Sequence, residues 1–315
     1  MNKGQDDAED ISKNNGSDGS DADDSDFIGP SISESVPEQP KRKRKVLDFE
    51  ETYLRNIPKA AAYEKSFMHR DYITHVEATP TDFLITASAD GHVKFWKKQH
   101  GEGIEFVKQF RSHLSRINDT SVNSNGTLLA TTSDDKTAKI CDVTNFDMIN
   151  MIRLDFRPGK CEWIHNPSDP VAAIAISDAD SPDIYIFDGR GSNESLKCIG
   201  RLHTKPVSAI KFNSIYEVAV SLDAQGMVEY WTGPKYDYSF PANVRWSSKM
   251  DTDLFEFVKA KTLAYCIAIS PNGQRIAALS TDRKVRVFNF STGKLSKVLD
   301  EALSVYISNK STDYL

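Results

Sequence analysis

The chain has 315 residues, of which 39% are apolar, 27% charged and 10% aromatic. This composition is typical of a globular protein with a polar surplus. No run of 18 or more apolar residues is present, and the N-terminus lacks a basic and then apolar leader, so we expect neither a membrane-spanning helix nor a secretory signal. The net charge of −6 is unevenly distributed, because residues 1–40 contain eleven acidic and only two basic residues.

The first 45 residues differ in composition from the rest. Residues 1–40 are rich in Asp, Ser, Gly and Asn, and such a segment buries too little apolar surface to order itself. We therefore expect a disordered acidic tail over 1–45. Its last five residues form a basic run that suits a nuclear import signal, although a solvated charge run is the alternative. The run consists of Lys41, Arg42, Lys43, Arg44 and Lys45. The adjacent acidic residues would partly neutralise these cations, so direct nucleic-acid binding is not expected.

After a lead-in segment, 46–66, the sequence predicts short β-strands over 67–300, with a divergent tail at 301–315. Five segments each contain an apolar strand, a polar turn and an alternating strand that ends in a large or apolar residue, here called the closing residue. The closing residues are Trp96, Cys141, Phe187, Trp231 and Phe288. They lie 45, 46, 44 and 57 residues apart. A period of 40–45 residues is typical of β-propeller blades.

The longer last step predicts an insertion at about 232–256. It contains several aromatic residues and two prolines, so it reads as a long loop. Exposed aromatic side chains can anchor a partner, which makes this insertion the best candidate interaction surface, with packing across a blade as the alternative. The four cysteines are far apart and form no C-x-x-C pair, so we expect buried, reduced thiols and no zinc site.

Histidine and aspartate recur with the same period. His69 lies 21 residues before Asp90, and His113 lies 22 before Asp135. His203 lies 22 before Gln225, with Asp223 two residues nearer. Ser, His and Asp are also the residue types of a hydrolase triad, but an active site would occur once, whereas this pair repeats. We therefore expect structural hydrogen bonds, with no catalytic, cofactor or metal residues. The proposed network consists of His69, Ser88, Asp90, Trp96, His113, Ser133, Asp135, His203, Asp223, Trp231 and Asp282.

This set of His, Ser, Asp and Trp resembles the WD-repeat family, in which these residues pin a tight turn to neighbouring strands. The resemblance has gaps, because Cys141, Phe187 and Phe288 stand in place of the Trp, and the third and fifth repeats lack the histidine. It implies an all-β propeller of about five blades. We expect the ring to be incomplete and open, with the disordered N-terminal tail preceding it.

Several non-periodic stretches are more specific, among them SFMHRDYITHV (66–76), VTNFDMINM (143–151) and DRKVRVFNFSTGKL (282–295). They are similar to the WD-repeat region of the spliceosome-associated cyclophilins that carry WD repeats. That family implies a nuclear scaffold in mRNA splicing with splicing proteins as partners, and the basic run at 41–45 adds a nuclear import carrier as an expected partner. We find no segment similar to the cyclophilin domain. We therefore expect a truncated form of such an isomerase that does not itself catalyse, with peptidylprolyl isomerase activity or another chromatin or RNA-processing adaptor as the alternatives.

Overall fold

The computed structural model describes residues 51, 54–55, 67–101 and 103–305. The acidic tail, the Lys41–Lys45 run, most of the lead-in segment and residues 306–315 lie outside the described residues. All the strands discussed below belong to one compact unit, residues 51–315. Among the residues that the structure describes, none of the helices has the length and apolar character needed to cross a bilayer.

The described chain forms five antiparallel sheets, which we call blades 1 to 5 in chain order. Blade 1 contains β1 (Ile73–Ala78), β2 (Phe83–Ser88), β3 (His92–Gln99) and β4 (Gly103–Arg111). Blade 2 contains β5 (Ile117–Val122), β6 (Leu128–Ser133), β7 (Thr137–Asp142) and β8 (Met148–Arg153). Blade 3 contains β9 (Pro158–Trp163), β10 (Ala173–Asp178), β11 (Ile184–Asp188) and β12 (Lys197–Ile199). Blade 4 contains β13 (Val207–Asn213), β14 (Val218–Asp223) and β15 (Val228–Thr232), and blade 5 contains β16 (Ala264–Ile269), β17 (Arg275–Ser280), β18 (Lys284–Asn289) and β19 (Leu295–Asp300).

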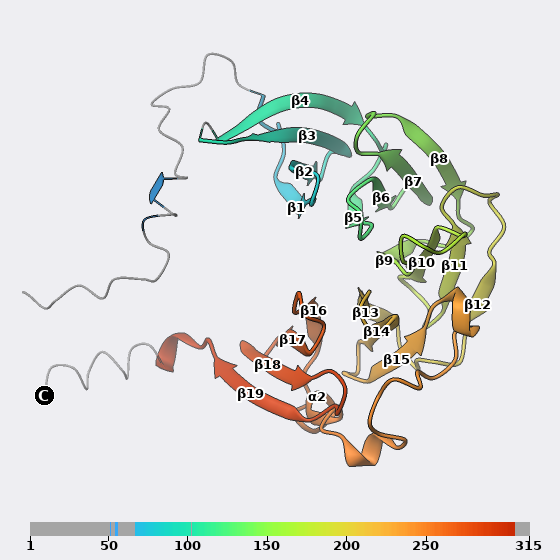
Figure 1. Ribbon diagram of the computed structural model, residues 1–315, viewed down its shortest axis with the longest axis vertical. Helices are drawn as coiled ribbons and strands as arrows, with labels where there is room; N and C mark the ends of the chain where they lie inside the picture. Colours follow the sequence, from blue (N-terminus) through green and yellow to red (C-terminus); the bar gives the residue numbers. More distant parts are fainter. Residues whose placement is uncertain (1–50, 52–53, 56–66, 102, 306–315) are drawn as a thin grey trace, which may run out of the picture. The chain divides into compact units, whose positions relative to one another are not determined.

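The blades follow one another around a common centre, with their first strands innermost (Figure 1). Each inner strand contacts the next, from β1 through β5, β9 and β13 to β16. Apolar side chains alternate along the second and third strands, so each blade presents one apolar face to each neighbour. Between blades 1 and 2, for example, Phe95 and Ile85 pack against Ile117 and Leu129. The predicted all-β, WD-repeat propeller of about five blades is confirmed.

The turn between the second and third strands is tight and depends on glycine in blade 1. Gly91 has a φ of +82°, a conformation that a side chain disfavours. A Cβ atom built there would lie 2.3 Å from the carbonyl oxygen of His113, whose N–H donates to the Gly91 carbonyl. The turn of blade 1 is thereby joined to the segment that leads into blade 2.

The inner strands of blades 1 and 5 are the more exposed ones. Val76 of β1 is 58% exposed and Tyr265 of β16 is 50% exposed, whereas the corresponding strands of blades 2 to 4 are largely buried. This exposure fits an arrangement in which blades 1 and 5 are the two ends of an open series. The expectation of four buried thiols is half wrong, because Cys141 and Cys161 are buried but Cys198 and Cys266 are exposed.

Blade 4 is the exception among the sheets, because it has three strands where the others have four. The chain that follows β15 contains two short 3-10 helices, η1 (Pro234–Tyr236) and η2 (Lys249–Asp251), and then α2 (Glu256–Lys259). The insertion predicted at about 232–256 therefore stands in the chain position of a fourth strand. Its aromatic residues differ in exposure: Trp246 is 7% exposed and packs on Tyr230, as the alternative of packing across a blade predicts, whereas Tyr236 and Phe240 are 45% and 49% exposed.

Candidate functional site

The predicted network takes its most complete form in blade 2. The ring of His113 is fully buried, and its Nδ1 lies 3.0 Å from a carboxylate oxygen of Asp135. Because a carboxylate only accepts, Nδ1 carries the proton, and Nε2 accepts from the Thr131 hydroxyl at 2.8 Å. Asp135 also accepts from the backbone N–H of Leu114 and from the hydroxyl and N–H of Thr137. We call this arrangement the His–Asp clasp.

Electrostatics keep the clasp in one protonation state. Burial lowers the pKa of His113, although Asp135 opposes this shift. Burial also disfavours the charged form of Asp135, but the hydrogen bonds from Thr137 and His113 outweigh it and lower the pKa of this carboxyl group. The clasp therefore consists of a neutral imidazole and an ionised carboxylate near neutral pH.

Blade 1 has the same residue types but a looser arrangement. His69 Nε2 lies 2.7 Å from the Thr86 hydroxyl, which also accepts from Trp96 Nε1 at 2.9 Å. The Asp90 carboxylate instead contacts Ser88 and His92, and the buried Nδ1 of His69 has no hydrogen-bond partner among the described residues. A histidine at the position of Thr137 therefore draws the aspartate away from the clasp.

Blade 4 places its histidine beside a displaced acid, but the two facing atoms, His203 Nδ1 and one Asp223 oxygen, have no hydrogen-bond partner among the described residues. His203 Nε2 lies 2.6 Å from the Ser221 hydroxyl, which accepts from Trp231 Nε1 at 3.1 Å. His203 Nδ1 lies 3.6 Å from Asp223, and both side chains are fully buried. Gln225, which has the expected spacing, instead accepts from the hydroxyl of Thr204.

The hydroxyl partners of the histidines in blades 1 and 2 are not among the residues of the proposed network. They are Thr86 and Thr131, whereas Ser88 donates to Asp90 and Ser133 accepts from the backbone of Asp135. A signal for this was present in the sequence. A Thr or Ser lies ten residues before the closing residue in four of the five repeats, at Thr86, Thr131, Ser177 and Ser221.

Blade 5 replaces the histidine with an arginine of its own sheet. Arg286 is 4% exposed, and its guanidinium donates to Asp282 at 2.7 Å and to Ser280 at 2.6 Å. The same position, two residues before the closing residue, is Lys94 in blade 1 and Lys139 in blade 2. Those ammonium groups donate to backbone carbonyls just before their blades, at Met68 (2.8 Å) and Ser112. We did not predict this recurring cation from the sequence.

A second network, also missed, joins the blades through their inner strands. Asp119 of β5 lies 3.4 Å from His75 of β1 and 3.4 Å from Lys160 of β9. On β9, Glu162 accepts from the Ser121 hydroxyl and from Lys211 Nζ of β13, both at 2.9 Å.

These charges lie at the junctions of three consecutive pairs of blades. Burial raises the pKa of Glu162, an effect that Lys211 opposes, and the negative charges around Lys211 raise the pKa of its amine despite burial. The cation is therefore fixed between blades 3 and 4, where it compensates a buried carboxylate.

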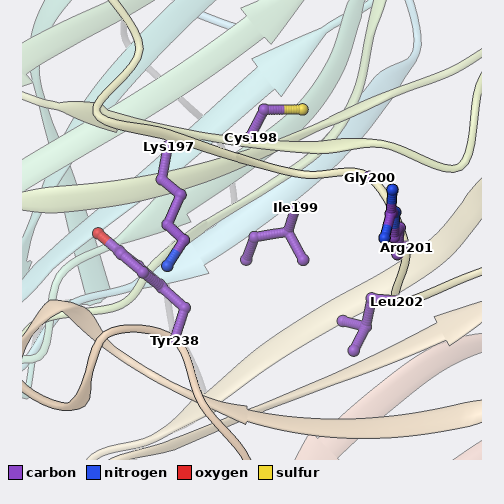
Figure 2. A pocket seen from close by; sticks show the side chains of 7 residues that line it. All are labelled: Lys197, Cys198, Ile199, Gly200, Arg201, Leu202 and Tyr238. Atoms are coloured by element: carbon purple, nitrogen blue, oxygen red, sulfur yellow. The ribbon is translucent and has the colours of Figure 1, made fainter.

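The perimeter of blades 3 and 4 contains an open groove with a cavity of about 660 Å³ (Figure 2). It is lined by Lys197, Cys198, Ile199, Gly200, Arg201, Leu202 and Tyr238. Tyr238 comes from the insertion, and the other lining residues come from β12 and the segment after it. In the described part of the chain, no group of three His, Cys, Asp or Glu residues is placed to hold a metal ion.

Comparisons with known proteins agree with this geometry. A family profile described as WD domain, G-beta repeat matches residues 64–97, 104–142 and 258–289. These matches and the five-bladed fold define the chain as a WD-repeat β-propeller protein.

The chain is 54% identical over 265 residues to the human peptidylprolyl isomerase domain and WD repeat-containing protein 1. This alignment covers 84% of this chain and 41% of the relative. A peptidyl-prolyl cis-trans isomerase of Rhizopus delemar is 45% identical over 295 residues, 93% of this chain and 46% of the relative. One of Arabidopsis thaliana is 45% identical over 267 residues, 84% of this chain and 42% of the relative. The chain is thus related to these proteins and spans less than half of their length.

Proposed function

We propose that this chain is a nuclear interaction scaffold that serves mRNA splicing and that it catalyses no reaction itself. The observation that carries the proposal is the rigid five-bladed body with a side groove, together with 54% identity to a protein named for WD repeats and a peptidylprolyl isomerase domain. Propeller blades hold their loops and edges in fixed positions, which suits binding to several proteins.

Affinity capture of the tagged chain from nuclear extract, followed by mass spectrometry, tests the scaffold proposal. We expect splicing components to be enriched over a capture with an unrelated propeller. Enrichment of chromatin proteins without splicing components would favour another adaptor, and no enrichment of any protein would reject the scaffold.

Nuclear entry depends in this proposal on the basic run at 41–45. Replacing Lys41, Arg42, Lys43, Arg44 and Lys45 by alanine should leave the tagged chain in the cytosol, because an import carrier binds successive cations. Replacing Lys97 and Lys98, two exposed lysines of β3, is the matched control. Unchanged nuclear accumulation of the 41–45 variant would reject this import signal.

The second candidate function, proline isomerisation, is favoured only by the names of the relatives. A proline-isomerisation assay on the purified chain separates the two. We expect a rate equal to the uncatalysed background and no binding of a cyclosporin-type ligand. A rate proportional to chain concentration would make the chain an enzyme.

A further inference from the structure

We propose that the groove beside β12 binds an extended peptide of a partner protein, and that this peptide pairs with the edge of β12 and combines apolar side chains with carboxylates. The inference rests on the proposed scaffold function and names its contact surface. It follows from three features of the groove: a free strand edge, an apolar floor and an unpaired cation.

The first feature is the strand edge. β12 is the outermost strand of blade 3 and pairs only with β11, through Lys197, Cys198 and Ile199. Apart from that pairing, none of the backbone groups of these residues bonds to another segment within the described residues. Unpaired N–H and C=O groups along a strand are a template for one more strand. Because β12 is only three residues long, it can support a short, weakly bound peptide.

The second feature is the floor of the groove. Ile199, Leu202 and Tyr238 are half-buried and pack against the apolar core between blades 3 and 4. In Figure 2, the Ile199 side chain lies between the Lys197–Tyr238 pair and Leu202. Since blade 4 has no fourth strand, this part of the seam keeps an accessible apolar surface. Alternate side chains of an added strand would point toward it.

The wall of the groove is preformed. Lys197 Nζ donates to the Asp237 carboxylate at 2.6 Å and lies 5.0 Å from the centre of the Tyr238 ring. Asp237 and Tyr238 have φ angles of 51° and 57°, which is strained for residues with side chains. Hydrogen bonds to the carbonyls of Pro234 and Gly233 hold this turn, so Tyr238 is fixed in place before any peptide arrives.

The third feature is charge. The ammonium group of Lys197 is already paired, but Arg201 is exposed, and within the described part of the chain its side chain has neither an ion pair nor a hydrogen bond. A carboxylate of the peptide would give Arg201 a partner, whereas a basic peptide would be repelled by Arg201, whose charge is not compensated by a carboxylate of the described residues. The chemistry therefore favours an acidic peptide over a basic one.

Nuclear magnetic resonance of the full ¹⁵N-labelled chain tests the proposal with a defined probe. The probe is the capped peptide Ser-Glu-Val-Thr-Val-Glu-Ser, and its control has Lys in place of both Glu. We expect the acidic peptide to shift the amide signals of residues 196–202 and 238 in a saturable way, and the basic peptide to leave them unchanged. Shifts confined to other blades, or none at millimolar peptide, would overturn the proposal.

A charge-reversal variant tests the role of Arg201 in binding the peptide. Arg201→Glu should weaken binding of the acidic peptide on the order of tenfold and create binding of the basic one. Arg153→Glu, at an exposed arginine of the outer strand of blade 2, is the matched control and should change neither affinity. Equal affinities of the wild type and Arg201→Glu for the acidic peptide would refute the groove as its binding site. If the groove fails while affinity capture still enriches splicing components, the scaffold proposal stands, and the two failures are distinguishable.

Discussion

Replacing His113 by alanine is the sharpest test of the clasp. The imidazole is fully buried and makes its closest hydrogen bonds to Asp135 at 3.0 Å and to Thr131 at 2.8 Å. Each such bond contributes about 1 kcal/mol net, and more when one partner is charged. Removing the ring also leaves a cavity and deprives a largely buried carboxylate of a donor. We therefore expect a loss of about 3 kcal/mol of unfolding free energy, or roughly 6–12 °C in Tm.

Urea denaturation followed by tryptophan fluorescence measures this loss. His100→Ala removes an exposed histidine after β3 and should change stability by less than about 0.5 kcal/mol. A loss of under about 1 kcal/mol for His113→Ala would refute the clasp as a source of stability.

The pH dependence gives an independent readout. The pKa of His113 is lower in the folded chain than its usual 6.5, so below that pH the unfolded chain binds more protons. The contribution of the neutral His113 imidazole to the free energy of unfolding is therefore complete above about pH 6.5 and is lost as pH falls below it. The wild type should therefore lose stability from pH 7.5 to 5.5, and His113→Ala should lose less over the same interval. An identical slope for the two proteins would contradict the neutral, buried imidazole.

Three further predictions concern the other networks. His69→Ala should lower the free energy of unfolding by only about 1 kcal/mol in the same denaturation assay, because the Nδ1 of His69 has no hydrogen-bond partner among the described residues. A loss equal to that of His113→Ala would contradict the weaker role of His69. Lys211→Met should lower the free energy of unfolding by about 3 kcal/mol, because it leaves the Glu162 carboxylate without its cation. Adding Glu162→Gln should recover part of that loss. A double variant that is less stable than Lys211→Met would argue against a stabilising pair. The Arg286 hydrogen bond lowers the pKa of Asp282 to about 2, so this acid stabilises the fold above about pH 4, and the effect is lost as pH falls toward 2. Arg286→Met should be destabilised by about 2 kcal/mol at pH 6 and by less at pH 3, and a constant difference would refute the assignment.

The repeat predicted the blades because it is a local signal. The closing residues lie on the third strands of all five sheets, since apolar alternation, a polar turn and a large last residue are encoded within about fifteen neighbouring positions. Because this signal is local, it did not identify all the residues of the hydrogen-bonded network. The proposed Ser88 and Ser133 lie two residues beyond the hydroxyls that the histidines contact, because the recurrence of Thr86 and Thr131 does not say which hydroxyl faces the histidine until the sheet register is known.

The contacts between blades were invisible to a search for repeated motifs. His75, Asp119 and Lys160 lie 44 and 41 residues apart on three different inner strands, but they are different residue types, so no repeated residue connects them. The groove was not predicted from the sequence for a similar reason. Its residues come from β12 and from Tyr238, which are about 40 positions apart, and only the missing fourth strand of blade 4 leaves the floor between them uncovered.

The distribution of these contacts explains how a degenerate repeat still forms a blade. Blade 3 has no histidine clasp, but its inner strand β9 carries the densest set of bonds to other blades. Asp119 accepts from the backbone N–H of Cys161 at 2.9 Å, and Trp163 Nε1 donates to the carbonyl of Ser121 at 3.0 Å. Glu162 of the same strand is bound to blade 4 through Lys211. Blade 3 is thus held through its inner strand by blades 2 and 4, whereas blade 5, which also lacks the histidine, keeps an equivalent contact within its own sheet through Arg286.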